Sequence, residues 1–343
     1  MRKLKSIQAL RGVAALAVVA YHCSQWTTVY RLTPRVFEAG AAGVDLFFLI
    51  SGFIMWAAVN AREMSAASFL WRRVARVGPA YWVATLVTAA LALSWPKIFQ
   101  EVVLGGPWHL VLSLAFVPHP DPRGLPFPIL QPGWTLSYEA LFYLAFAASL
   151  MCVRRWRFTV LTATLAGVWM IGVSWPRAYT FIANMLLMQF VAGAGLAIAW
   201  RSGRLKSRTW SWAAIACGLA LFALLEAFGY RPGLWRPLIW GGAAGLLLGG
   251  AVAAEAAGIN RIWAWLAPVG DASYSIYLWH WPALMALERI VGMRSAAGFI
   301  AEGMGLSLLL GLAGRALIER PALGLLRKRW PLQFRSIQAG GSA

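Results

Sequence analysis

Charged residues are scarce in this chain, and acidic residues are the scarcest. Of the 343 residues only 13% are charged, with 12 aspartate or glutamate against 31 lysine or arginine. Soluble domains carry about 25% charged residues, so this composition excludes an ordinary soluble domain. The apolar residues make up 60% of the chain, and they gather in repeated runs of roughly 20, the length of a membrane-spanning helix.

Cysteine and histidine are also few, with 3 and 4 residues respectively. Cys23, Cys152 and Cys217 lie in or at the edges of apolar runs and form no Cys-x-x-Cys pair. We therefore expect buried, unreactive thiols, no disulfide framework and no metal site. The net charge of +19 would suit nucleic acid in a soluble protein. In a membrane protein the positive-inside rule explains it better, so no nucleic-acid partner is expected.

Ten apolar runs predict transmembrane helices, so we expect an all-α polytopic protein embedded in the lipid bilayer. These runs cover about residues 7–26, 43–60, 79–95, 134–153, 158–175, 179–200, 210–228, 236–256, 268–290 and 297–318. With ten spans, most of the basic residues fall on the side that holds both termini, which the positive-inside rule assigns to the cytoplasm. We expect a transmembrane domain over 1–321, a basic cytoplasmic tail over 322–343, and a location in the cell inner membrane.

Arg11 and His22 stand eleven residues apart in the first predicted span. At about 100° per residue, eleven steps return to nearly the same face of a helix, roughly 16 Å further along. Ionisable side chains inside a bilayer usually line a cavity and mark a functional path. An arginine there can hold a phosphate or carbonyl oxygen, and a histidine can accept a proton from a hydroxyl group. The sequence leaves open that Arg11 reaches the inner headgroups and that His22 bonds a backbone carbonyl.

A basic cluster and an acidic residue come next in the chain. Arg72, Arg73 and Arg76 fall within two helical turns at the predicted cytoplasmic end of the third span. Their spacing suits bidentate phosphate binding, and it equally suits ordinary positive-inside anchoring. Asp45 opens the second span. It either steadies a histidine, accepts a hydrogen bond from a sugar hydroxyl, or caps the helix N-terminus.

Two later spans carry further polar residues. Glu139 lies about a turn and a half into the fourth span, where a carboxylate needs a partner or a proton. His280 lies in the middle of the ninth span, before a proline that loosens the backbone hydrogen bonding. Ser273 and Tyr274 lie near the inner end of that span. A purely structural hydrogen bond or ion pair is the alternative role for these side chains.

The longest predicted outer loop, residues 96–133, is rich in proline and is suited to presenting binding residues. Its apolar stretch 108–117 is too short to span a bilayer and suits an interfacial or re-entrant segment. We expect His109 and His119 in this loop to be solvated.

Taken in order, these motifs strongly resemble the acyltransferase-3 family of integral membrane O-acyltransferases, and most of all its exopolysaccharide acetyltransferases of the succinoglycan type. The resemblance runs from about Ile7 to Pro321. It rests on Arg-x10-His, G-V-D-x-F-F-x-I-S-G-F, R-R-x-x-R-x-x-P-x-Y-W, W-T-L-S-Y-E-x-x-F-Y, S-Y-x-I-Y-L-x-H-x-P and E-R-P. Many O-antigen-type members have a second acid beside Glu139, where this chain has Ala140, so a role for that acid does not transfer.

The resemblance implies acetyl-CoA as the cytoplasmic acyl donor and a glycan or lipid-linked sugar as the acceptor. It implies that Arg11 and His22 are the essential pair and that Arg72, Arg73 and Arg76 engage the CoA. In the mechanism that we expect, Glu139 joins the catalytic set, and Asp45, Glu139 and His280 orient the imidazole or bind the acceptor. His22 then acts as general base or carries the acetyl group itself. Contact with polysaccharide assembly machinery is left open. The alternative function is a proton-coupled transporter that uses the same intramembrane residues.

Overall fold

The computed structural model describes residues 4–59, 64–174, 185–205, 207–229, 235–259 and 261–329, and within these ranges every regular element is helical. The all-α prediction is confirmed. The α-helices are α1 (Lys5–Val29), α2 (Ala42–Val59), α3 (Ala66–Ser94), α4 (Gly106–Leu114), α5 (Trp134–Leu150), α6 (Arg157–Ser174), α8 (Leu187–Arg201), α9 (Arg208–Ala227), α10 (Arg236–Ala256), α11 (Arg261–Ile290), α12 (Ala296–Gly314) and α13 (Arg320–Arg329). Shorter helical turns are η1 (Glu38–Ala41), η2 (Gln131–Gly133), η3 (Arg154–Trp156) and η5 (Arg315–Glu319).

Seven helical segments in the described part of the chain are long and apolar enough to cross a membrane, which marks a multi-pass membrane protein. Every one of the ten predicted spans coincides with a helix. However, α5, α8 and α11 are not among these seven. The helices α5 and α8 are short, with 17 and 15 residues. The number of spans and the cytoplasmic side of the termini therefore stay predictions. Residues 179–184 of the sixth predicted span and 330–343 of the predicted tail lie outside the described residues.

Burial separates an inner set of helices from an outer set. In the segments that contain α2 and α10, 78% and 67% of the most apolar 18-residue stretch is buried. In those that contain α6 and α9, the buried share is 17%. The outer helices thus turn apolar side chains outward, as lipid contact requires. Cys217 lies on the outward face of α9 and is exposed, and Cys152 is half-buried. The prediction of buried thiols therefore holds for Cys23 and is wrong for Cys217.

Glycines allow the inner helices to cross in direct contact. A Cβ atom at Gly270 of α11 would lie 1.6 Å from the Gln8 carbonyl oxygen of α1, and one at Gly12 would lie 2.9 Å from the Gly270 nitrogen. Such close backbone approach between membrane helices depends on the missing side chain. It fixes α1, which carries Arg11, against α11, which carries His280.

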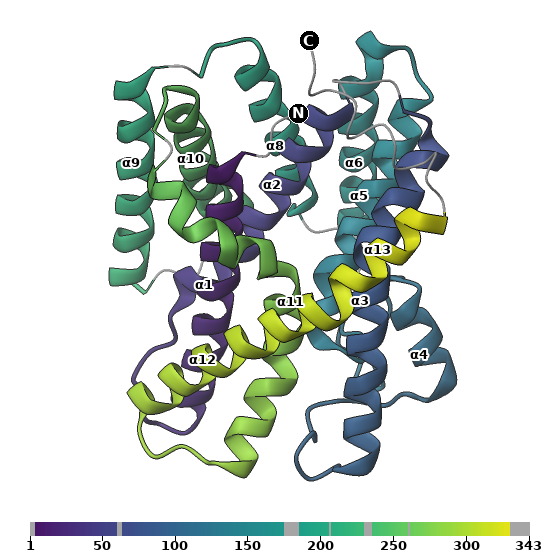
Figure 1. Cartoon of the computed structure of the whole chain (residues 1–343), viewed down its shortest axis with the longest axis vertical. Coiled ribbons are helices and arrows are strands. Elements are labelled where there is room, and N and C mark those ends of the chain that lie inside the picture. Colours follow the sequence, from purple (N-terminus) through teal and green to yellow (C-terminus); the bar gives the residue numbers. More distant parts are fainter. Residues whose placement is uncertain are drawn as a thin grey trace.

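The C-terminal helices form one continuous diagonal across the molecule. In Figure 1, α12, η5 and α13 run as a single yellow rod past α11, α1 and α3. The rod changes to π-helical geometry over η5, where Glu319 is buried. A π-helical turn shifts the side chains that follow it relative to a regular helix, and such turns are frequent at functional sites.

Candidate active site

The face of α1 that carries Arg11 and His22 borders two adjoining cavities. Arg11 lines a cavity of about 310 Å³, which we call the arginine cavity, and His22 lines one of about 230 Å³, the histidine cavity. Val44 and Tyr277 line both cavities and form the boundary between them. Both predicted side chains therefore face space enclosed by the protein.

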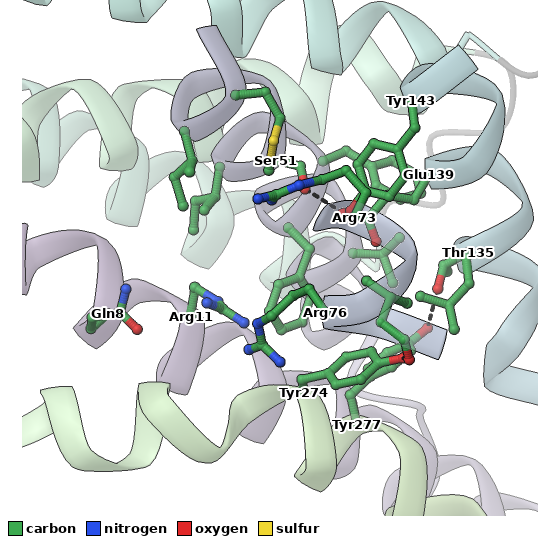
Figure 2. Close-up of a pocket in the computed structure, with 18 residues that line it drawn as sticks. Gln8, Arg11, Ser51, Arg73, Arg76, Thr135, Glu139, Tyr143, Tyr274 and Tyr277 are labelled. Atoms are coloured by element: carbon green, nitrogen blue, oxygen red, sulfur yellow. Dashed lines mark hydrogen bonds between the residues drawn. The ribbon is translucent and has the colours of Figure 1, made fainter. Parts of the chain in front are cut away.

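Five helices contribute polar side chains to the arginine cavity, and Figure 2 shows these side chains around it. These polar residues are Gln8 and Arg11 of α1, Ser51 of α2, Arg73 and Arg76 of α3, Thr135, Glu139 and Tyr143 of α5, and Tyr274 and Tyr277 of α11. The Arg11 and Arg76 side chains approach each other from opposite sides of the cavity (Figure 2). Facing guanidinium groups in a low-dielectric site repel each other and favour an anionic or strongly polar ligand.

Carboxylates compensate these guanidinium groups incompletely. Arg76 donates to Glu319 at 2.6 Å, and Glu319 also accepts from the Ser275 hydroxyl at 2.8 Å. Among the described residues no carboxylate lies within ion-pair distance of Arg11 or Arg73. Glu139 lies in the cavity wall and accepts from the Ser51 hydroxyl at 2.6 Å. The cavity therefore keeps an excess of positive charge.

In the histidine cavity, a glutamine side chain orients His22. The His22 Nδ1 lies 2.8 Å from the Gln25 Oε1, and the Gln25 Nε2 donates to the Tyr21 hydroxyl at 2.9 Å. An amide oxygen only accepts hydrogen bonds, so the His22 proton is on Nδ1. The Nε2 then carries the lone pair, which is the form a general base or nucleophile needs.

Aromatic rings hold His22 on its other sides. The His280 ring stacks on it with centroids 5.2 Å apart, and the Trp281 ring contacts it edge-on at 5.0 Å. The His280 Nδ1 lies 2.7 Å from the Tyr277 carbonyl oxygen and donates to it. His280 is fully buried and has no exposed surface. It contacts the His22 ring directly, and its supporting role stays a prediction.

Asp45 has other partners. It lies in the first turn of α2, is fully buried, and accepts from Arg236 at 2.8 Å and from Gln189 at 2.5 Å. Arg236 lines the histidine cavity. Asp45 therefore reaches this cavity through an arginine and makes no contact with the His22 imidazole.

The structure gathers most, though not all, of the predicted site residues. Tyr274 lines the arginine cavity and donates to the Val77 carbonyl at 2.7 Å. Arg72 and Ser273 are buried and line neither cavity. Arg73 and Arg76 are three residues apart and line the arginine cavity, whereas Arg72, which is four residues from Arg76 and also shares its face, does not.

Sequence reasoning missed three residues of the site. Gln25 follows His22 by three residues and so shares its helix face, a signal that was available in the sequence. Tyr277 lies three residues from both Tyr274 and His280, so the sequence offered the same signal for it. Arg236 gave no such signal, because its position depends on how α10 packs. The prediction for His109 and His119 is wrong, since both are buried and their nitrogens lie 3.1 Å apart.

A multi-pass helical bundle with a cationic cavity beside a cavity containing an imidazole with an unprotonated Nε2 suits a protein that transfers a group within the membrane. Comparison with known proteins makes the class specific. The acyltransferase-3 family model, described as an acyltransferase domain, matches residues 4–314, and the chain belongs to this family. The protein is therefore an acyltransferase, and the transporter alternative has no support.

Several curated proteins are similar to this chain. The exopolysaccharide production protein ExoZ of Rhizobium meliloti is 37% identical over 304 residues, 87% of this chain and 94% of that protein. The peptidoglycan O-acetyltransferase OatA of Listeria monocytogenes is 26% identical over 81% of this chain, which covers 49% of that protein. The acyltransferase MdmB of Streptomyces mycarofaciens is 25% identical over 96% of this chain and 94% of its own. No solved structure matches this chain.

Proposed function

We propose that the protein moves an acetyl group from cytoplasmic acetyl-CoA to a hydroxyl group of an extracellular or lipid-linked polysaccharide, in the cell inner membrane. Two relatives support this choice of acceptor through their names, which refer to exopolysaccharide production and to peptidoglycan O-acetylation. The observation that carries the proposal is the pair of adjoining cavities, one cationic and one holding the His22 imidazole with a free Nε2.

The arginine cavity suits the donor. Its excess positive charge matches the anionic CoA, and its volume of about 310 Å³ is far smaller than the whole coenzyme. The arginine cavity therefore takes the thioester end of acetyl-CoA. Arg11 either binds the thioester carbonyl oxygen or guides the thioester into position. Arg73 and Arg76 face the same cavity and attract the phosphate-bearing part.

The histidine cavity suits the acceptor hydroxyl. The His22 Nε2 accepts the hydroxyl proton as the oxygen attacks the thioester carbonyl carbon. The carbon–sulfur bond then breaks, the new ester forms, and the proton on His22 passes to the CoA thiolate. In the covalent variant, Nε2 attacks the carbonyl carbon first, the carbon–sulfur bond breaks and CoA leaves as the thiolate. The acceptor oxygen then takes the acetyl group as the bond to Nε2 breaks, and the hydroxyl proton passes through His22 to the CoA thiolate. Both routes require the Nδ1–H tautomer that Gln25 favours.

The experiment compares wild type with His22→Ala, each purified and reconstituted with radiolabelled acetyl-CoA and the host's de-O-acylated surface polysaccharide. General base catalysis contributes about 10²–10⁴-fold, so transfer should fall by that factor while membrane abundance and thermal stability stay normal. His109→Ala, which removes a histidine outside both cavities, serves as the control. Normal acetyl transfer by a folded His22→Ala protein would refute the proposal.

A further inference from the structure

A third cavity, of about 420 Å³, adjoins the histidine cavity and has no lining residue in common with the arginine cavity. We call it the loop cavity, because residues between 98 and 131 line it together with the ends of α1 and α11. Gln25, Phe127, Gln131 and Trp281 line both the loop cavity and the histidine cavity. The three cavities therefore follow one another in series, with the His22 cavity in the middle.

An aromatic path leads from His22 into the loop cavity. The Trp281 ring contacts His22 at a centroid distance of 5.0 Å, and the Trp26 ring contacts Trp281 at 4.9 Å. Trp281 is buried, and its indole nitrogen has no hydrogen-bond partner in the described part of the chain. An indole ring can pack against the apolar face of a ligand, and its N–H can donate a hydrogen bond to a ligand hydroxyl group.

The charges in the loop cavity are paired with one another. Glu288 accepts from the Tyr30 hydroxyl and lies 2.8 Å from Arg289. The hydrogen bond to Glu288 raises the pKa of Tyr30, so this phenol stays protonated. Arg123 lies 4.0 Å from Glu101, which also lines the cavity, and 2.9 Å from Asp121, which lies outside the cavity lining.

This balance of charges distinguishes the loop cavity from the arginine cavity, where two guanidinium groups lack an ion-pair partner among the described residues. A balanced set of donors and acceptors beside aromatic rings suits a neutral ligand with many hydroxyl groups better than an anion. Carbohydrate is the ligand class with that chemistry.

On the proposed function, we infer that the loop cavity binds the sugar residues next to the one being acylated. The histidine cavity, at about 230 Å³, has room for a single sugar ring beside His22, and the larger loop cavity takes its neighbours on the Trp26–Trp281 surface. The acceptor is then a saccharide chain, and a free monosaccharide is a poor substrate because it leaves the loop cavity unused.

The test measures acetyl transfer to two probes prepared from the host's own surface polysaccharide after de-O-acylation and partial hydrolysis: its monosaccharides and its short oligosaccharides. In wild type we expect kcat/KM for the oligosaccharides to exceed that for the monosaccharides at least tenfold. Trp26→Ala should abolish this preference, and Trp26→Phe should restore most of it. Trp108→Ala, at a 70% exposed position on α4, should keep the full preference.

The outcomes separate this inference from the proposed function. Equal transfer to both probes in wild type, or an undiminished preference in Trp26→Ala, would overturn the role of the loop cavity while leaving acetyl transfer to sugars in place. Failure of wild type to acetylate any saccharide would overturn the proposed acceptor and the inference with it. Glu288→Gln provides a second variant if Trp26→Ala does not fold, and it should also reduce the preference.

Discussion

At the residue scale, the orientation of His22 comes from a neutral amide. Serine hydrolases use a buried carboxylate for this purpose, and Asp45 and Glu139 were the candidates for it in the sequence. The structure instead pairs Asp45 with Arg236 and Glu139 with Ser51. Because Gln25 carries no charge, it fixes the His22 tautomer without strongly stabilising an imidazolium, which keeps Nε2 available at neutral pH.

Substitution of Gln25 tests this arrangement. Gln25→Leu removes the Nδ1 acceptor and lets the imidazole rotate and change tautomer, so we expect kcat to fall by roughly tenfold or more, part of the contribution of a general base. Gln25→Glu keeps an acceptor at the same position and should retain more activity than Gln25→Leu. In this variant the activity that depends on unprotonated His22 should also appear only at higher pH, because a carboxylate stabilises the imidazolium.

Steady-state kinetics over a range of pH checks both expectations. A merely structural Gln25 would lower protein yield and leave the pH profile of the folded fraction unchanged. Equal kcat values for wild type and Gln25→Leu would contradict the positioning role.

At the scale of elements, the sequence predicted the helices well and their contacts poorly. Each predicted span coincides with a helix because apolar length is a local property. The contact of α1 with α11 depends on Gly12 and Gly270, which are 258 positions apart in the sequence, and single glycines in apolar helices are too common to indicate it. Arg236 enters the site only through such contacts, and for this reason the sequence did not reveal it.

The α1–α11 contact allows a prediction about the stability of the protein. Gly270→Ala would place a methyl group 1.6 Å from the Gln8 carbonyl oxygen, and a backbone atom cannot move aside as a flexible side chain can. We expect a loss of about 1–3 kcal/mol or more from overpacking, measured as a lower Tm in detergent. Gly245→Ala in α10 is the control, because a Cβ there meets no atom within 4 Å. An unchanged Tm for Gly270→Ala would show that the two helices are not in direct contact.

At the scale of the whole molecule, three cavities in series create a need for a barrier. Tyr277 stands at the boundary of the arginine and histidine cavities, and its hydroxyl is held by Thr135 at 3.0 Å and by the Pro132 carbonyl at 3.2 Å. Val44 lies opposite in the shared wall and is buried. On the proposed function, we expect side chains fixed in this way to keep the water of the two cavities apart.

Removal of the Tyr277 ring should therefore open a path for protons. We expect proteoliposomes containing Tyr277→Ala to dissipate an imposed pH gradient faster than those containing wild type, as reported by a trapped pH-sensitive dye. Tyr277→Phe keeps the ring and should leak much less. A rate for Tyr277→Ala equal to that of protein-free liposomes would show that other residues form the barrier.

Under the proposed function, the boundary at Val44 and Tyr277 also determines what leaves the cell. On the proposed function, a two-carbon fragment passes this point and the nucleotide that delivered it does not. The cell can thus decorate a polymer outside its membrane while its coenzyme pool stays within, and cleavage of the thioester bond inside supplies the free energy for an esterification where no nucleoside triphosphate is present.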